Sequence, residues 1–141
     1  MAEPSRDWLI METLQARLQT VLVSNNYRTD IGQDVRLEAA KTPPLAPMIT
    51  LYCGGRTRPQ DAGTRGEREL VLVAEARIPA SLDNAQETAV AIDADMEQAL
   101  DEWLFQPGAL PLRFEESVIL DRPDGVAEVV VQHMYTTRYR R

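Results

Sequence analysis

The sequence is poor in the side chains on which catalytic and metal sites most often depend. Its 141 residues include one cysteine, Cys53, one histidine, His133, and one lysine, Lys41. A lone cysteine excludes an internal disulfide and a metal cluster held by several cysteines. No group of histidine and carboxylate side chains completes a metal site either. We therefore expect no catalytic residue, no cofactor and no metal ion.

The chain also lacks a long apolar run and a basic character. No apolar stretch approaches the ~18 residues needed to cross a bilayer. Residues 1–5 lack the basic region and apolar stretch of a secretory signal, so we expect none. The net charge of −7 argues against general nucleic-acid binding, which needs a basic surface or stripe. The partners we expect are proteins, and neither a membrane nor a nucleic acid.

Two stretches have the apolar periodicity of helices. Apolar side chains recur at spacings of three and four over residues 6–25, with Ser5 as the expected N-cap. A second stripe predicts a helix from Asp83 to about Phe105, where Asp83 and Gln86 resemble a capping box. Each helix has one apolar stripe, so each can bury one face.

Alternation of apolar and polar residues predicts the strands. The clearest pattern covers residues 67–78, a shorter one covers residues 48–53, and a weaker one covers residues 35–37. The side chains of the strand at 48–53 that we expect to face the core are Ile49, Leu51 and Cys53. These strands belong to one sheet, in which one face is strongly apolar.

The last part of the chain predicts a long β-hairpin. Strand-like runs over residues 114–120 and 126–139 flank a turn that contains Pro123 and Gly125. The second run is much longer than the usual strand of roughly 5–6 residues. We expect the edge of this terminal strand to be hidden or shared with a neighbour.

These elements predict an α+β fold in a single domain over residues 1–141. The simplest way to bury the apolar surfaces is a mostly antiparallel sheet with both helices packed on one face. The other face of the sheet keeps Tyr52, Val71 and Val73, which we expect to pack against a loop or another subunit. Residues 54–66 are rich in glycine, and we expect a flexible loop there.

The candidates for chemistry each have a simpler interpretation. We interpret His133 as a structural or interface residue, because no nucleophile or orienting carboxylate is evident beside it. Asp93 and Asp95 point roughly 200° apart on a helix and cannot share one ion there, although Asp93 and Glu97 could. We interpret these carboxylates as a solvated acidic face. Cys53 is interpreted as a core residue at a strand end.

Arginines on the predicted loop and at the C-terminus are the stronger candidates for binding. These arginines place positive charge on an acidic chain. The predicted loop is either simply solvated, or it becomes ordered when it binds an acidic surface of a partner. The candidate partner or ring-interface residues are Arg56, Arg58, Arg65, Arg68, Arg138 and Arg140, together with the acidic helix residues Glu97 and Asp101.

Four stretches of this sequence carry a resemblance to a known family. They are the opening amphipathic helix through Val23, the segment Pro-Met-Ile-Thr-Leu-Tyr at 47–52, the strand at 69–78 with the acidic helix after it, and the closing strand at 127–139. In this order they resemble the tail-terminator proteins of long-tailed bacteriophages, the family of the lambda-type minor tail protein U.

The resemblance implies a structural role in a virion. Family members have a compact α/β fold and form a six-membered ring that caps the tail tube, ends tube polymerisation and offers a surface to the head-completion protein. They use no catalysis and no cofactor, and they pass from the host cytoplasm into the virion tail. The alternatives are another neck or head–tail joining protein, and a small ligand-binding or enzymatic domain with a cleft near His133 and Cys53.

Overall fold

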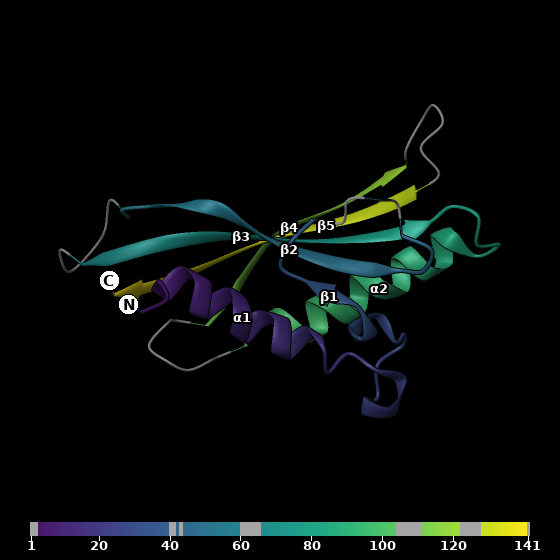
Figure 1. The fold of residues 1–141 in the computed structure, drawn as a ribbon, viewed down its shortest axis with the longest axis horizontal. Coiled ribbons are helices and arrows are strands. Elements are labelled where there is room, and N and C mark those ends of the chain that lie inside the picture. Colours follow the sequence, from purple (N-terminus) through teal and green to yellow (C-terminus); the bar gives the residue numbers. More distant parts are fainter. Residues whose placement is uncertain are drawn as a thin grey trace.

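One five-stranded sheet carries the fold, and two helices lie on the same side of it (Figure 1). The computed structural model describes residues 3–39, 42, 44–59, 66–103, 111–121 and 128–140. Within these ranges it confirms the predicted α+β fold, with a mostly antiparallel sheet, both helices on one face and a long antiparallel pair at the C-terminal end.

The first helix, α1, covers Arg6–Leu18 and begins as predicted. The Ser5 hydroxyl caps it by accepting a hydrogen bond from the Trp8 backbone N–H at 3.2 Å. The helix ends earlier than predicted, at Leu18 rather than near residue 25, and Gly32 packs against its last turn. A Cβ atom at Gly32 would lie 2.5 Å from the Leu18 carbonyl oxygen, so only glycine fits this return of the chain.

The second helix, α2, covers Ala85–Leu100. The predicted capping box at Asp83 is wrong, because residues 80–84 form turns and bends and Asn84 occupies the N-cap position without a side-chain cap bond. The helix ends at Leu100, where the Asp101 backbone N–H bonds to the Glu97 carbonyl oxygen at 2.9 Å. The predicted end near Phe105 lies outside the described residues.

The five strands have the order β1-β2-β3-β5-β4. They are β1 Val35–Arg36, β2 Met48–Thr57, β3 Glu67–Pro79, β4 Arg113–Asp121 and β5 Glu128–Arg140. The pair β1–β2 is parallel and the other pairs are antiparallel. The terminal strand β5 therefore lies between β3 and β4, so its edges are hidden within the sheet rather than shared with a neighbouring subunit.

The strand β2 is longer than the sequence predicts. It continues to Thr57 through an irregularity between Cys53 and Gly55, so the first part of the predicted loop at 54–66 is strand. Residues 60–65 of that loop lie outside the described ranges. Cys53 was predicted to be a core residue but is exposed, although it pairs with the buried Leu72 just before this irregularity.

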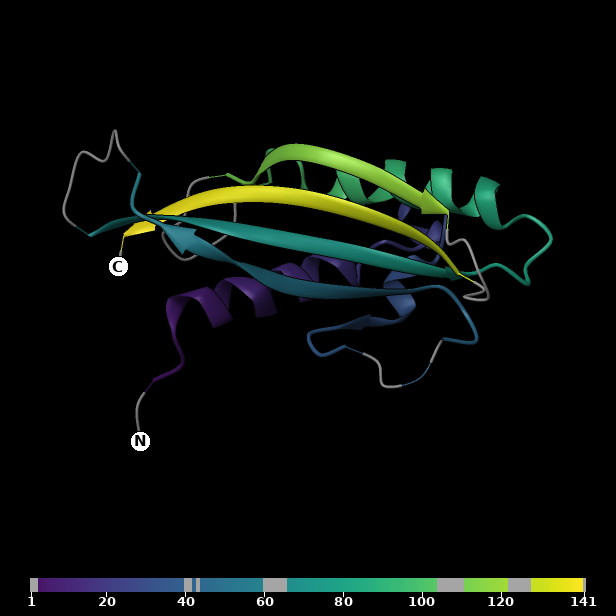
Figure 2. The same cartoon turned by 90° about the horizontal axis from the view of Figure 1, so that it is seen from above.

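The core lies between the helices and one face of the sheet. In Figure 2, α1 lies along the β2 side and α2 along the β4 side of the sheet. The buried side chains of α1 are Ile10, Met11, Leu14 and Leu18, and those of β3 are Leu70, Leu72, Ala74, Ala76 and Ile78. No described helix covers the opposite face of the sheet, which we call the open face.

Candidate functional site

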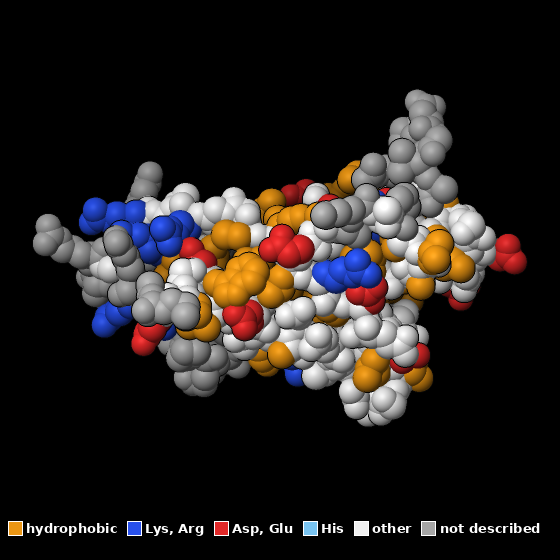
Figure 3. All heavy atoms as spheres, in the orientation of Figure 1, with side chains coloured by type: hydrophobic (Ala, Val, Ile, Leu, Met, Phe, Trp, Pro, Cys, Tyr) orange, Lys and Arg blue, Asp and Glu red, His pale blue; other side chains and the backbone are white. Residues whose placement is uncertain are grey.

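Five arginines gather at one end of the sheet. The antiparallel register brings the end of β2, the start of β3 and the end of β5 together, since Arg56 pairs with Leu70 and Arg68 with Tyr139. Figure 3 shows these basic side chains at the left end of the molecule. We call this surface, made of Arg56, Arg58, Arg68, Arg138 and Arg140, the arginine end. The predicted candidate Arg65 lies outside the described residues.

Part of the arginine end is neutralised within the chain. Arg56 Nη1 donates to Asp7 Oδ2 at 3.0 Å, and the same carboxylate accepts a hydrogen bond from the Tyr139 hydroxyl. Burial and the bond to Asp7 raise the pKa of Tyr139. Arg138 lies 3.5 Å from Glu67 Oε1. The positive charge that reaches solvent is therefore smaller than the number of arginines suggests.

Arg58 and Arg140 are the exposed exceptions. Neither makes an ion pair within the ranges that the structure describes, whereas Arg56 and Arg138 do. A guanidinium group carries five donors in a planar fork that suits carboxylates on a partner. These two side chains are thus the part of the arginine end with unused binding capacity.

The two acidic candidates lie elsewhere, on the outer side of α2. Glu97 and Asp101 are exposed, and Asp101 Oδ1 accepts a hydrogen bond from the Phe114 backbone N–H at 3.2 Å. The positive side chain beside them is Arg28, which lines the same surface hollow. The structure therefore separates these acidic residues from the arginine end rather than bringing the two sets together.

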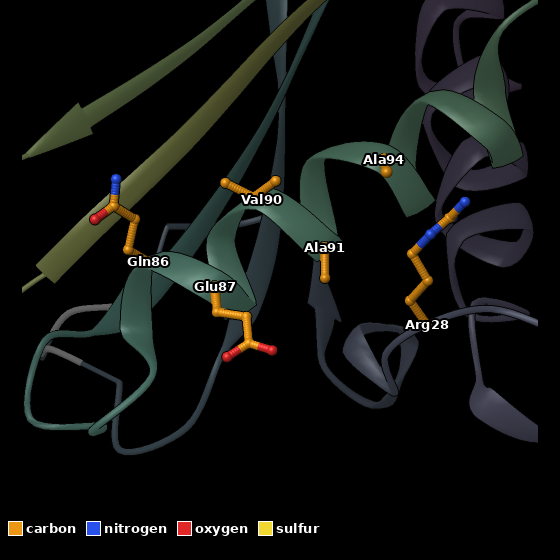
Figure 4. A pocket seen from close by; sticks show the side chains of 6 residues that line it. All are labelled: Arg28, Gln86, Glu87, Val90, Ala91 and Ala94. Carbon is orange, nitrogen blue, oxygen red and sulfur yellow. The ribbon is translucent and has the colours of Figure 1, made fainter.

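An open hollow of about 600 Å³ lies further along the outer side of α2 (Figure 4). Its lining residues are Arg28, Gln86, Glu87, Val90, Ala91 and Ala94. The small side chains Ala91 and Ala94 form its floor, while Arg28 reaches it from the segment that follows α1. Ligand sites usually enclose their ligand and converge several polar groups on it, and this open surface does neither.

His133 is fully buried beneath α2, in a polar cluster. Its Nε2 lies 2.5 Å from Asp93 Oδ1, and its Nδ1 lies 2.7 Å from the Tyr135 hydroxyl. The Ser117 hydroxyl donates to Asp93, and the Tyr135 hydroxyl donates to the Met96 carbonyl oxygen at 3.4 Å. Burial, and then the carboxylates of α2, raise the pKa of Tyr135 far above its ordinary value. The cluster fastens α2 to β4 and β5.

The order of hydrogen bonds in this cluster differs from that of a hydrolytic triad. In such a triad the imidazole lies between the nucleophile and the carboxylate. Here the Asp93 carboxylate lies between Ser117 and His133, so the serine hydroxyl is bonded to an anion instead of a base. The geometry therefore fits the structural interpretation of His133.

Asp95 is the residue that the sequence analysis placed least well. It is fully buried, although it was predicted to belong to a solvated acidic face. Its carboxylate accepts hydrogen bonds from the backbone N–H groups of Arg28 and Thr29, from the Thr29 hydroxyl at 2.7 Å and from the Arg28 guanidinium at 3.0 Å. The available signal was its spacing, since Asp95 lies three residues after Ile92 and four before Ala99, both in the apolar stripe.

The described residues offer no further chemical site. Among them, no group of three or more histidine, cysteine, aspartate or glutamate side chains is placed to hold a metal ion. None of their helices has the length and apolar character that crossing a membrane requires. The surfaces at the arginine end, on α2 and on the open face are what remains for function.

The fold, rather than the sequence, has known counterparts. No protein-family profile and no curated protein matches the chain. A chain from the virion of a native gene transfer agent particle is 18% identical, covers 91% of this chain and 95% of its own length, and has a TM-score of 0.59. A second solved chain is 15% identical over 93% of this chain and 96% of its own. Its TM-score of 0.45 is too low to indicate a shared fold. The chain thus shares its fold with a protein of the gene transfer agent virion.

Proposed function

We propose that this chain is a structural protein of a phage-like virion, in which it acts as a tail terminator. Copies of the chain form a ring, six-membered in the family that the sequence resembles. The ring caps the finished tail tube, ends its polymerisation and provides the surface that joins the head. The role involves no catalytic step and no cofactor, and the protein passes from the host cytoplasm into the virion tail.

The observation that carries the proposal is the fold shared with a chain of the gene transfer agent virion. The match covers 91% of this chain and 95% of the other, so the likeness extends over the whole fold rather than one motif. The sequence resemblance to tail terminators supports the same setting on separate grounds.

The surface of each subunit must be able to contact the next subunit if identical copies are to form a ring. Head-to-tail contacts need two different, complementary patches on every subunit. The arginine end and the acidic residues Glu97 and Asp101 at the end of α2 have opposite charge, and no ion pair joins the two sets within the described residues. Both sets are therefore proposed as ring or partner contacts, each with its own complementary surface on another subunit or partner.

Polymerisation of tail-tube subunits tests the role directly. Tube subunits are assembled with and without this chain, and tube lengths and ends are measured by negative-stain electron microscopy. We expect shorter tubes that carry extra density at one end and do not grow when more tube subunits are added. Tubes that elongate equally in both samples would overturn the terminator role. Binding to tube ends without any stop to growth would favour the other neck or joining proteins.

A further inference from the structure

The open face of the sheet carries an apolar surface that the chain itself leaves uncovered. Its central side chains are Tyr52, Val71, Val73, Val118, Leu120 and Met134, which come from four adjacent strands. Leu120 and Met134 are 44% and 38% exposed. An apolar surface of this kind, with charged residues beside it, is typical of a contact with another protein.

A hollow of about 180 Å³ lies within this surface. Its walls are Val73, Val118 and Met134, and its polar groups are Glu116 and Gln132. The Gln132 amide reaches toward Glu75 at 3.5 Å, so part of its capacity is used. Glu116 is exposed and makes no ion pair or hydrogen bond with the described residues. We call this site the open-face hollow.

The arginines beside the open-face hollow are already paired within the chain. Arg77 holds Glu128 at 2.6 Å, and Arg113 lies 3.3 Å from Glu115. Arg140 at the arginine end is too far away to form an ion pair with Glu116 of its own subunit. Arg140 lies six positions beyond Met134 on β5, which is about 20 Å at the usual rise of a strand. Among the residues that the structure describes, the carboxylate of Glu116 has no cationic partner, so it can accept a cation from another molecule.

We propose that the open-face hollow receives the arginine end of a second copy of this chain. The charges are complementary, because the described part of the chain gives Glu116 no cationic partner and gives Arg58 and Arg140 no anionic one. Valine and methionine walls suit the apolar stem of an arginine, and the carboxylate suits its planar head. The contact joins two different surfaces and therefore propagates from subunit to subunit. The inference rests on the proposed function, since it assumes a protein that assembles from copies of itself.

Site-directed crosslinking between two differently labelled variants tests this contact. Both variants carry Cys53→Ser, and one has Met134→Cys in the hollow while the other has Thr57→Cys beside Arg58. A short bismaleimide is added to the mixture, and crosslinked dimer is measured by mass spectrometry. The matched control replaces Met134→Cys with Gln98→Cys, an exposed position on α2 between the acidic candidates.

We expect about fivefold more dimer from the hollow variant than from the α2 control, and a return to the control level when Glu116→Arg is added, because like charges then meet. Equal yields in the two mixtures would overturn the inference. So would a larger yield from the α2 control, which would show that the arginine end contacts α2. Either result leaves the terminator role standing, because tube capping is measured separately.

Discussion

The inner side of α2 and the arginine end both contain charged side chains, but those on α2 are hydrogen-bonded within the fold and some of those at the arginine end are exposed. Asp93 is hydrogen-bonded to Ser117 and His133 of the sheet, and Asp95 to the segment that contains Arg28 and Thr29. Arg58 and Arg140 lie at the rim of the sheet, where the described part of the chain gives them no ion pair. A buried charge needs hydrogen bonds or an ion pair within the fold, whereas an exposed charge is solvated and remains available to a binding partner. The comparison separates residues that support stability from residues that are available for binding.

The largest effect is expected from Asp95→Ala. This change leaves the backbone N–H groups of Arg28 and Thr29 without their acceptor, so the free energy of unfolding should fall by about 3 kcal/mol. Urea denaturation measures the loss, with Glu97→Ala on the exposed side of the same helix as control. Equal stability of the two variants would remove the distinction between the two regions.

A somewhat smaller loss is expected from Asp93→Ala. Without this carboxylate the buried Nε2 of His133 loses its partner, at a cost of about 2 kcal/mol. The same denaturation measurement gives the value. Ser117→Ala is the milder companion variant, because it removes one of the two bonds to Asp93 and leaves His133 paired. A loss as large in Ser117→Ala as in Asp93→Ala would contradict the account of this cluster.

The buried tyrosine predicts a dependence on alkaline pH. Burial raises the pKa of Tyr135 above the ordinary value of 10.0, so the folded chain keeps a proton that the unfolded chain loses. Above about pH 10 the free energy of unfolding should therefore decrease, by about 1.4 kcal/mol per pH unit for this group. Tyr135→Phe should reduce that slope. Equal slopes between pH 9.5 and 11 in both proteins would show that the hydroxyl is not protected.

The smallest effect on stability is expected at the arginine end. Replacing Arg56 and Arg58 with alanine should leave the unfolding midpoint nearly unchanged, because both side chains are exposed. The same variant should bind less well to its partners and cap tail tubes less efficiently. Thermal unfolding and the tube-length measurement are made on one preparation. Normal capping by this variant would exclude these arginines as contacts.

The positions of helices and strands were largely evident in the sequence because they depend on local periodicity. The alternation in β3 and the stripes of α1 and α2 predicted which faces are buried. Errors arose where a distant segment intervened. Gly32 approaches the last turn of α1 and coincides with its end, and β2 becomes irregular directly after Cys53, which is exposed. Neither event leaves a periodic signal.

The sequence predicted the residues of the candidate surfaces but not how they are arranged. The sequence indicated the arginines and the acidic residues of α2, because clustered charge is visible in the order of residues. It did not show that β2, β3 and β5 join their arginines into one surface, since that depends on strand order. The pairing of Asp93 with His133, 40 residues away, was equally hidden.

By itself, the sequence determined the fold class, the apolar faces and the poverty in catalytic side chains, because these follow from composition and from contacts between near neighbours. The tertiary structure alone decided that β5 lies inside the sheet, that Asp95 is buried and that the described residues give Glu116, Arg58 and Arg140 no ion pair. The physical reason is that burial and pairing of charge depend on which distant segments meet, and the register of the sheet sets those meetings.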